Sequence, residues 1–166
     1  IAVITNKNKD TGLMTATKVA KFLCGKAEVF MSNDTVLDSA CGVTYTEPDE
    51  LFCVSDLAIV IGGDGTLLNV ASQCAKADIP ALGINLGRIG FMTEVEVSDI
   101  ENSLTKLLSG EYTKEKRMLL KASINDTETY HALNDIVVSK RDHEQLIGVD
   151  LYAGGGKNGG EEVSSV

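Results

Sequence analysis

The hydrophobic residues of this chain alternate between short, nearly continuous apolar runs and longer stretches with helical spacing. Four apolar runs have the length and composition of buried strands: Ile1–Ile4, Ala27–Met31, Leu57–Ile61 and Pro80–Ile84. Three stretches have the helical period: residues 13–23, 66–77 and 98–110. Strands that alternate with helices predict a doubly wound α/β fold, that is, a Rossmann-like domain with a parallel sheet.

The pattern changes after Gly110, where strand-like segments follow one another with no helix-period segment between them. These segments are Met118–Ile124, His131–Ser139, Ile147–Ala153 and residues 161–166. We therefore expect an α/β domain over residues 1–110 and a β-rich (all-β) second domain that begins within residues 111–166.

Composition and charge exclude several classes of protein. Hydrophobic residues make up 43 % and charged residues 23 % of the chain, which is typical of a folded globular protein. The net charge of −9 argues against a nucleic-acid binder. The sequence has no long apolar run, and its four cysteines lack CxxC spacing. We therefore expect free thiols, no zinc site, no membrane segment and a cytoplasmic location.

A glycine-rich turn follows directly on the apolar run 57–61, at a strand end where ligands collect in α/β sheets. Its residues are Gly62, Gly63, Asp64, Gly65 and Thr66. The glycines allow close approach of phosphate oxygens, and the following helix favours an anion. Asp64 could orient or deprotonate a substrate hydroxyl. The alternative is a tight turn in which Asp64 is only the helix N-cap.

Two further polar segments are candidate ligand-binding sites. Asn85 begins a loop with Gly87 and Gly90 after the next strand, and this loop either faces a ligand or is a wide turn shaped by glycines. Asn134 and Asp135 interrupt an apolar β run, where a buried polar pair needs partners such as a ribose diol. The alternative is a pair at a strand end or bulge that bonds to the local backbone.

These three segments, in this order, resemble the motifs of the NAD kinase family. The GGDGT turn is shared with diacylglycerol kinases and phosphofructokinases, whereas residues 83–94 are similar to the NAD kinase pattern of Asn, Gly, then Gly-Phe and an acidic residue. Residues 132–138 are similar to the Asn-Glu/Asp motif that NAD kinases use against the dinucleotide. The resemblance covers about the first 150 residues.

The resemblance implies an ATP-dependent kinase that phosphorylates the adenosine ribose 2′-hydroxyl of NAD, giving NADP. Asp64 would be catalytic, and the remaining candidates would bind the nucleotides: Gly62, Gly63, Gly65, Thr66, Asn85, Asn134 and Asp135. NAD and ATP would be the partners, Mg²⁺ would accompany ATP, and the protein itself would supply no metal site. The family likeness also implies a homo-oligomer, and it implies neither a nucleic-acid nor a membrane partner.

One departure from the family concerns its later Thr-, Gly- and Ser-rich segment, which does not occur before Val166. We therefore expect the second domain to be truncated and residues 1–166 alone to be inactive. Two rival functions follow. A lipid kinase of the same superfamily is disfavoured by residues 85–94 and by the lack of a membrane-binding stretch. A nucleotide-binding module without turnover is left open by the missing segment.

Overall fold

The computed structural model describes residues 1–38, 42–87, 90–124, 127–137, 139, 152–153 and 161–162 of the chain. Its contacts divide the chain into two units, Ile1–Asp135 and Ile136–Val166. In the second unit the described residues form one antiparallel pair, β9 (Tyr152–Ala153) with β10 (Glu161–Glu162). Everything that follows concerns the first unit. The domain boundary expected after residue 110 differs from this division after Asp135, and it stays a prediction.

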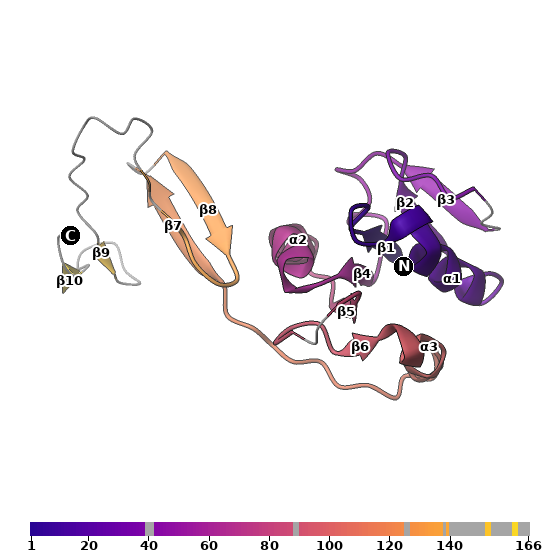
Figure 1. The fold of residues 1–166 in the computed structure, drawn as a ribbon. Helices are drawn as coiled ribbons and strands as arrows, with labels where there is room; N and C mark the ends of the chain where they lie inside the picture. Colours follow the sequence, from indigo (N-terminus) through magenta and orange to yellow (C-terminus); the bar gives the residue numbers. More distant parts are fainter. Residues whose placement is uncertain are drawn as a thin grey trace. The chain divides into compact units, whose positions relative to one another are not determined.

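The first unit is built on a six-stranded sheet in which every pairing is parallel. The strands are β1 (Ala2–Thr5), β2 (Val29–Ser32), β3 (Val43–Thr46), β4 (Ala58–Gly62), β5 (Ala81–Asn85) and β6 (Val95–Glu96). Their order is β3-β2-β1-β4-β5-β6 (Figure 1). From β1 the chain adds β2 and then β3 on one side. It then returns to place β4 on the other side of β1, and β5 and β6 follow outward from β4. This is the predicted Rossmann-like α/β fold, with its topological switch point between β1 and β4.

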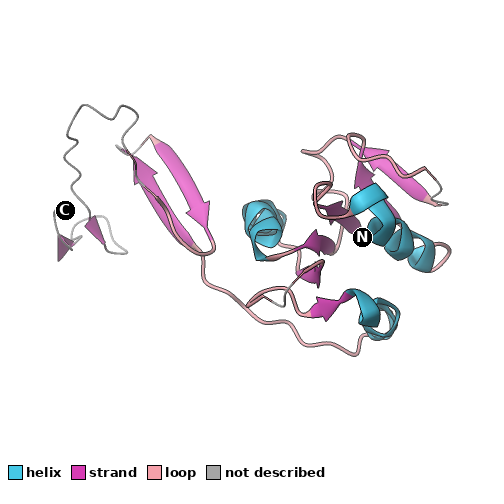
Figure 2. Ribbon diagram, in the orientation of Figure 1, coloured by secondary structure: helices cyan, strands magenta, loops and turns pink. Residues whose placement is uncertain are grey.

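Three helices cover the two faces of this sheet (Figure 2). They are α1 (Met14–Leu23), α2 (Asp64–Ala77) and α3 (Ile100–Ser109), with short 3₁₀ turns at Thr11–Leu13 and Val97–Asp99. Alternate residues of β4 enter different cores: Ile59 and Ile61 join the core that includes α1 and α3, whereas Val60 joins the core on the α2 side. All of β4 is buried, which explains its continuous apolar sequence.

Asp10 fixes the loop between β1 and α1. This residue is only 3 % exposed, and its two carboxylate oxygens accept hydrogen bonds from the backbone N–H groups of Thr15 (2.8 Å) and Ala16 (2.9 Å). The Thr5 hydroxyl at the end of β1 donates to the same carboxylate at 3.0 Å. One buried carboxyl group with three hydrogen-bond donors thus ties the end of β1 to the start of α1 and holds residues 6–10 at the carboxyl edge of the sheet.

After α3 the chain forms an antiparallel hairpin of β7 (Leu120–Ile124) and β8 (Glu128–Ala132). The predicted strand at 131–139 is wrong in its bounds, because Leu120 is the first residue of β7 and pairs with Ala132, the last residue of β8. Asn134 and Asp135 therefore lie beyond the strand instead of inside it. Most of the strand expected at 147–153, and most of 161–166, lies outside the described residues.

The cysteines differ in state. Cys53 and Cys74 carry free thiols, as expected. Cys24 is disulfide-bonded, which corrects the expectation of free thiols throughout. No helix in the described part of the chain is long and apolar enough to cross a membrane.

Candidate functional site

Three loops meet at the carboxyl edge of the sheet, around the switch point. The backbone N–H of Asn6, just after β1, donates to Ile61 O at 2.9 Å, and its side-chain amide donates to Thr66 Oγ1 at 3.3 Å. On the other side the Leu86 N–H, just after β5, donates to Gly62 O at 2.7 Å. The glycine-rich turn is therefore held between the loops that follow β1 and β5. In open α/β sheets ligands bind at this edge, beside the switch point.

The glycine-rich turn connects the end of β4 directly to the N-terminus of α2. Gly63 is the N-cap and Asp64 the first helical residue, so the alternative that Asp64 is the N-cap is wrong. Thr66 Oγ1 accepts a hydrogen bond from the Gly63 N–H at 3.4 Å, and a Cβ on Gly62 would overlap the Thr66 side chain. Within the described chain, the N–H groups of Asp64 and Gly65 have no acceptor. Such free N–H groups favour an anion.

Lys9 places a positive charge beside this helix end. Its ammonium nitrogen lies 3.2 Å from the position that a Cβ on Gly63 would occupy. The ion pairs found among the described residues involve other cations, Lys7, Lys18 and Arg117, so Lys9 is left without a carboxylate partner there. Lys9 was not among the predicted site residues, because nothing local in its polar loop indicates that β1 lies beside β4.

The Asp64 carboxylate does not bind its own helix but reaches the loop before β6. Its Oδ2 accepts a hydrogen bond from the Phe91 N–H at 2.8 Å. Its Oδ1 accepts from the N–H groups of Met92 (3.1 Å) and Thr93 (3.2 Å) and from the Thr93 hydroxyl (3.1 Å). A Cβ on Gly90 would overlap this carboxylate, which explains the glycine there. Asp64 thus joins the two loops that follow β4 and β5.

These contacts set the charge state of Asp64. Partial desolvation raises the pKa of its carboxyl, but the hydrogen bonds from Phe91, Met92 and Thr93 together lower it more, so that this pKa lies below its usual value. The carboxylate is therefore ionised at neutral pH.

Asn85 ends β5 directly opposite Gly62 in the parallel register. Its side chain is 5 % exposed, and its Oδ1 accepts a hydrogen bond from the Gly87 N–H at 3.0 Å. Its amide nitrogen Nδ2 is buried and has no partner among the described residues. A buried amide donor without a partner is costly, and a ligand oxygen at this edge of the sheet would satisfy it.

Phe91 adds an aromatic ring to the same loop. Asp64 binds its backbone, yet the residue is 94 % exposed. The sequence pattern contained this Gly-Phe pair, but the residue was given no role. An exposed ring beside a polar site can stack on a flat ligand group.

The structure brings together six of the eight predicted site residues: Gly62, Gly63, Asp64, Gly65, Thr66 and Asn85. Asn134 and Asp135 are exposed after β8, and within the described residues no hydrogen bond or ion pair joins them to the glycine-rich turn. Arg88, in the loop after β5, lies outside the described residues.

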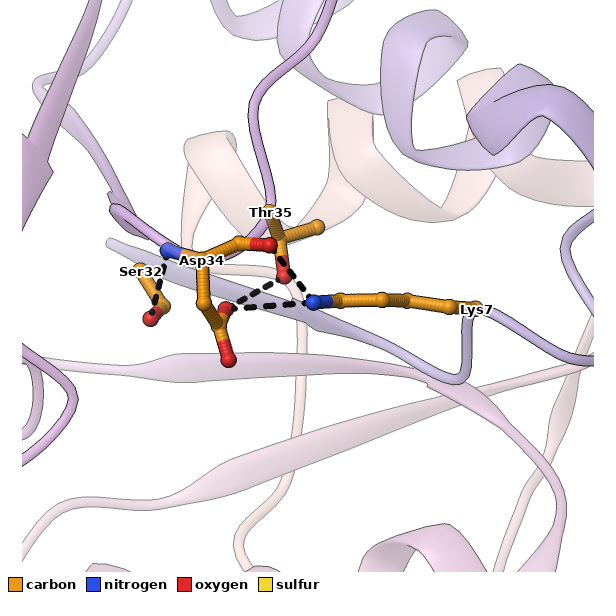
Figure 3. Close-up of polar contacts among 4 residues, drawn as sticks. All are labelled: Lys7, Ser32, Asp34 and Thr35. Carbon is orange, nitrogen blue, oxygen red and sulfur yellow. Dashed lines mark hydrogen bonds and ion pairs between the residues drawn. The ribbon is translucent and has the colours of Figure 1, made fainter.

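A hollow of about 520 Å³ opens at the ends of β1 and β2, with an apolar lining that includes Ile4, Leu51, Phe52 and Val70; none of residues 62–66 lines it. Figure 3 shows the contacts among four polar residues that line it, Lys7, Ser32, Asp34 and Thr35. The Lys7 ammonium donates to Asp34 O at 2.6 Å and lies 3.5 Å from Asp34 Oδ1, which also accepts a hydrogen bond from the Thr35 hydroxyl at 2.7 Å. Hydrogen bonds from Thr35 and Ser32 hold the pKa of the Asp34 carboxyl below its usual value. The sequence analysis did not identify this hollow.

Comparison with known proteins places this arrangement in context. The family profile described as the ATP-NAD kinase N-terminal domain matches residues 1–112. The NAD kinase of Heliobacterium modesticaldum is 39 % identical over 161 residues, which are 93 % of this chain and 56 % of that protein. The NAD kinase of Thermoanaerobacter sp. is 38 % identical over 157 residues, with 92 % and 56 % covered. The chain thus spans a little over half the length of these relatives.

A solved structure has a similar fold. Yeast NADH kinase complexed with NADH matches 80 % of this chain and 46 % of its own, with a TM-score of 0.63 and 19 % identity. At that identity the likeness concerns the fold alone.

Proposed function

The chain belongs to the NAD kinase family, and we propose on that premise that its protein transfers the terminal phosphoryl group of ATP to the adenosine ribose 2′-hydroxyl of NAD, giving NADP. The observation that carries the proposal is the ionised Asp64 carboxylate, held beside the free N–H groups of the α2 N-terminus. A hydroxyl acceptor and an anion-binding turn are thus adjacent at one edge of the sheet. Phosphoryl transfer needs this combination.

The donor phosphates are proposed to bind at the start of α2. The N–H groups of Asp64 and Gly65 point out of the helix end, Gly62 and Gly63 permit close approach, and the Lys9 ammonium adds a positive charge. Mg²⁺ is proposed to arrive with ATP, because this ion is commonly held by substrate phosphates with few protein ligands. No three-ligand cluster of His, Cys, Asp or Glu occurs in the described ranges, and a nucleotide-held ion requires none. When bound, Mg²⁺ would neutralise charge on the phosphates.

The acceptor hydroxyl is proposed to bind Asp64 Oδ2. A carboxylate has about four acceptor positions, and Oδ1 already receives three donors whereas Oδ2 receives one. Because its pKa is low, Asp64 is a weak base towards a free hydroxyl. It would therefore orient the 2′-hydroxyl first and accept its proton late, as the new O–P bond forms. Such timing suits a loose transition state.

The remaining candidates are assigned to the dinucleotide. Asn85 Nδ2 is proposed to donate to a phosphate or ribose oxygen, which would satisfy a buried donor. Asn134 and Asp135 are proposed to contact a ribose of NAD, on the strength of the family likeness. The family likeness also supports a homo-oligomer. The match of the N-terminal domain profile to residues 1–112 supports a second domain that starts near residue 111. A cytoplasmic location is proposed because the sequence has no long apolar run.

The test is made on the full-length protein that contains this chain. NAD binding and NADP formation are measured on one sample with ATP and Mg²⁺, and turnover that depends on Asp64 is expected. Binding without turnover would favour a nucleotide-binding module. Phosphorylation of a lipid in place of NAD would favour the lipid kinase.

A further inference from the structure

Thr93 makes two of the three long-range hydrogen bonds that hold Asp64 Oδ1. The two residues are 29 positions apart, and both the N–H and the hydroxyl of Thr93 donate to that one oxygen, at 3.2 and 3.1 Å. Thr93 is 1 % exposed and lies in the segment that leads into β6, whereas Asp64 opens α2. The sequence motifs gave Thr93 no role.

Gly83 of β5 fixes the orientation of the Thr93 side chain. A Cβ on Gly83 would lie 2.8 Å from Thr93 Cγ2 and 3.0 Å from its Cα, so the threonine occupies the space that the missing side chain leaves. A β-branched side chain has few staggered choices. With its methyl group packed against Gly83, the Thr93 hydroxyl is directed to the carboxylate.

The consequence concerns which oxygen of Asp64 stays accessible to a ligand. Met92 and Thr93 provide three donors to Oδ1, which fills it, while Oδ2 keeps room for one more. Loss of the Thr93 hydroxyl would remove the side-chain donor to Oδ1, so the carboxylate would be held less firmly and could rotate about its Cβ–Cγ bond. Small errors in the position of a reacting group are costly in enzymes.

We propose that Thr93 is a positioning residue, which fixes the Asp64 carboxylate so that Oδ2 faces the hydroxyl to be phosphorylated. The inference rests on the proposed function. A purely structural role would instead make Thr93 important only for the stability of the loop.

The experiment compares Thr93→Val with Thr93→Ser in the full-length protein. Valine keeps the branched shape and removes the donor, whereas serine keeps the donor. For T93V we expect kcat for NADP formation to fall by about tenfold to a hundredfold, the equivalent of one hydrogen bond to a charged group. The KM for NAD should change by less than about threefold, because a carboxylate that orients the hydroxyl acts mainly in the transition state. T93S should restore kcat to near the wild-type value.

A second readout is the acid limb of the kcat–pH profile. Loss of a hydrogen bond to the carboxylate raises its pKa, so the limb should move to higher pH in T93V and not in T93S. Two charged residues flank the turn among the described residues: Lys9 lies beside Gly63, and Glu94 follows Thr93. Both are exposed, and neither is changed in these variants, so a shift of the limb reports on the Thr93 hydroxyl.

A double-mutant cycle separates positioning from stability. In an Asp64→Asn background, T93V should have almost no further effect on kcat, because the group that Thr93 positions is already lost. Full additivity, or wild-type kcat in T93V, would overturn the inference. If T93V does not fold, Thr93→Cys, with its weak donor, is used with the same criteria. A wild-type protein that makes no NADP would instead refute the proposed function.

Discussion

The backbone N–H of Phe91 donates to Asp64 Oδ2 at 2.8 Å, and the same residue is 94 % exposed. The proposed hydroxyl acceptor therefore also fixes the position of an exposed aromatic residue. A flat ligand group that stacked on Phe91 would be held at a set place relative to the carboxylate. One loop could thus bind the ligand and align it.

Phe91→Ala tests this arrangement. Because the side chain is exposed, the melting midpoint should not change, whereas NAD binding should weaken by about 1–3 kcal/mol, the usual range for stacking on an aromatic side chain. Phe91→Tyr, which keeps the ring, serves as the positive control, and Met14→Ala removes another exposed side chain on α1. Calorimetric titration with NAD gives the affinities. Equal affinity of F91A and wild type would exclude stacking.

Asp64→Asn should lower NADP formation by about 10²–10⁴, the range for removing a positioned proton acceptor. The circular-dichroism spectrum should be unchanged. The melting midpoint should fall, because an amide group directs N–H donors at the N–H groups of residues 91–93. Thermal melts and initial rates are measured on the same preparation. Near-normal turnover would show that Asp64 only supports the loop.

The same contacts predict a pH dependence of stability. The pKa of the Asp64 carboxyl is lower in the folded protein than the ordinary value of about 3.9, so its contribution is present above that value and is lost as pH falls through the folded pKa. The difference in melting midpoint between wild type and D64N should therefore shrink as the pH is lowered from 7 to 3. A constant difference would mean that the charge on Asp64 does not stabilise the loop.

Lys9→Ala tests the donor side of the site. Removal of the ammonium beside Gly63 should raise the KM for ATP by about tenfold, the effect of one charge-assisted contact, and should change the KM for NAD less. Lys21→Ala, an exposed lysine in the last turn of α1, is the matched control. If both lysine variants behave alike, general electrostatic attraction explains the effect, and Lys9 has no specific role.

Replacement of Asn134 and Asp135 together by alanine should weaken NAD binding by about 1–3 kcal/mol, the cost of unpairing polar groups in a binding site. Both residues are exposed, so the melting midpoint should stay constant. ATP binding should change less than NAD binding. An equal loss for both nucleotides would indicate that the pair supports the second domain instead.

Much of the fold was predictable because its signals are local. β4 is buried on both faces and therefore reads as a continuous apolar run, and the turn after it is recognisable from three glycines. β3 was not predicted, because three of its four residues are half-buried and one is exposed, and β6 is only two residues long and gives no pattern. Asn134 and Asp135 were misplaced because the end of β8 depends on where its partner β7 begins.

The site was less predictable, because the contacts that complete it are not local. The glycine-rich turn was found, yet the direction of the Asp64 side chain depends on Thr93, which is 29 residues away. Lys9 reaches the turn only because β1 lies beside β4, a consequence of strand order that no short segment encodes. Hydrogen-bond partners across strands are a property of the tertiary structure, and sequence patterns indicate only which residue types are available.

The strand order also has a consequence for folding while the protein is synthesised on the ribosome. Asn6 and Thr66 touch across 60 residues, and Asp64 reaches its last donor only when Thr93 exists. A chain made at about 5–20 residues per second must therefore wait seconds, with β1 unpaired to β4, before the site can form. Contacts of such long sequence separation slow folding. One edge of the apolar strand β1 thus stays without its β4 partner until well after α1 and β2 have been made.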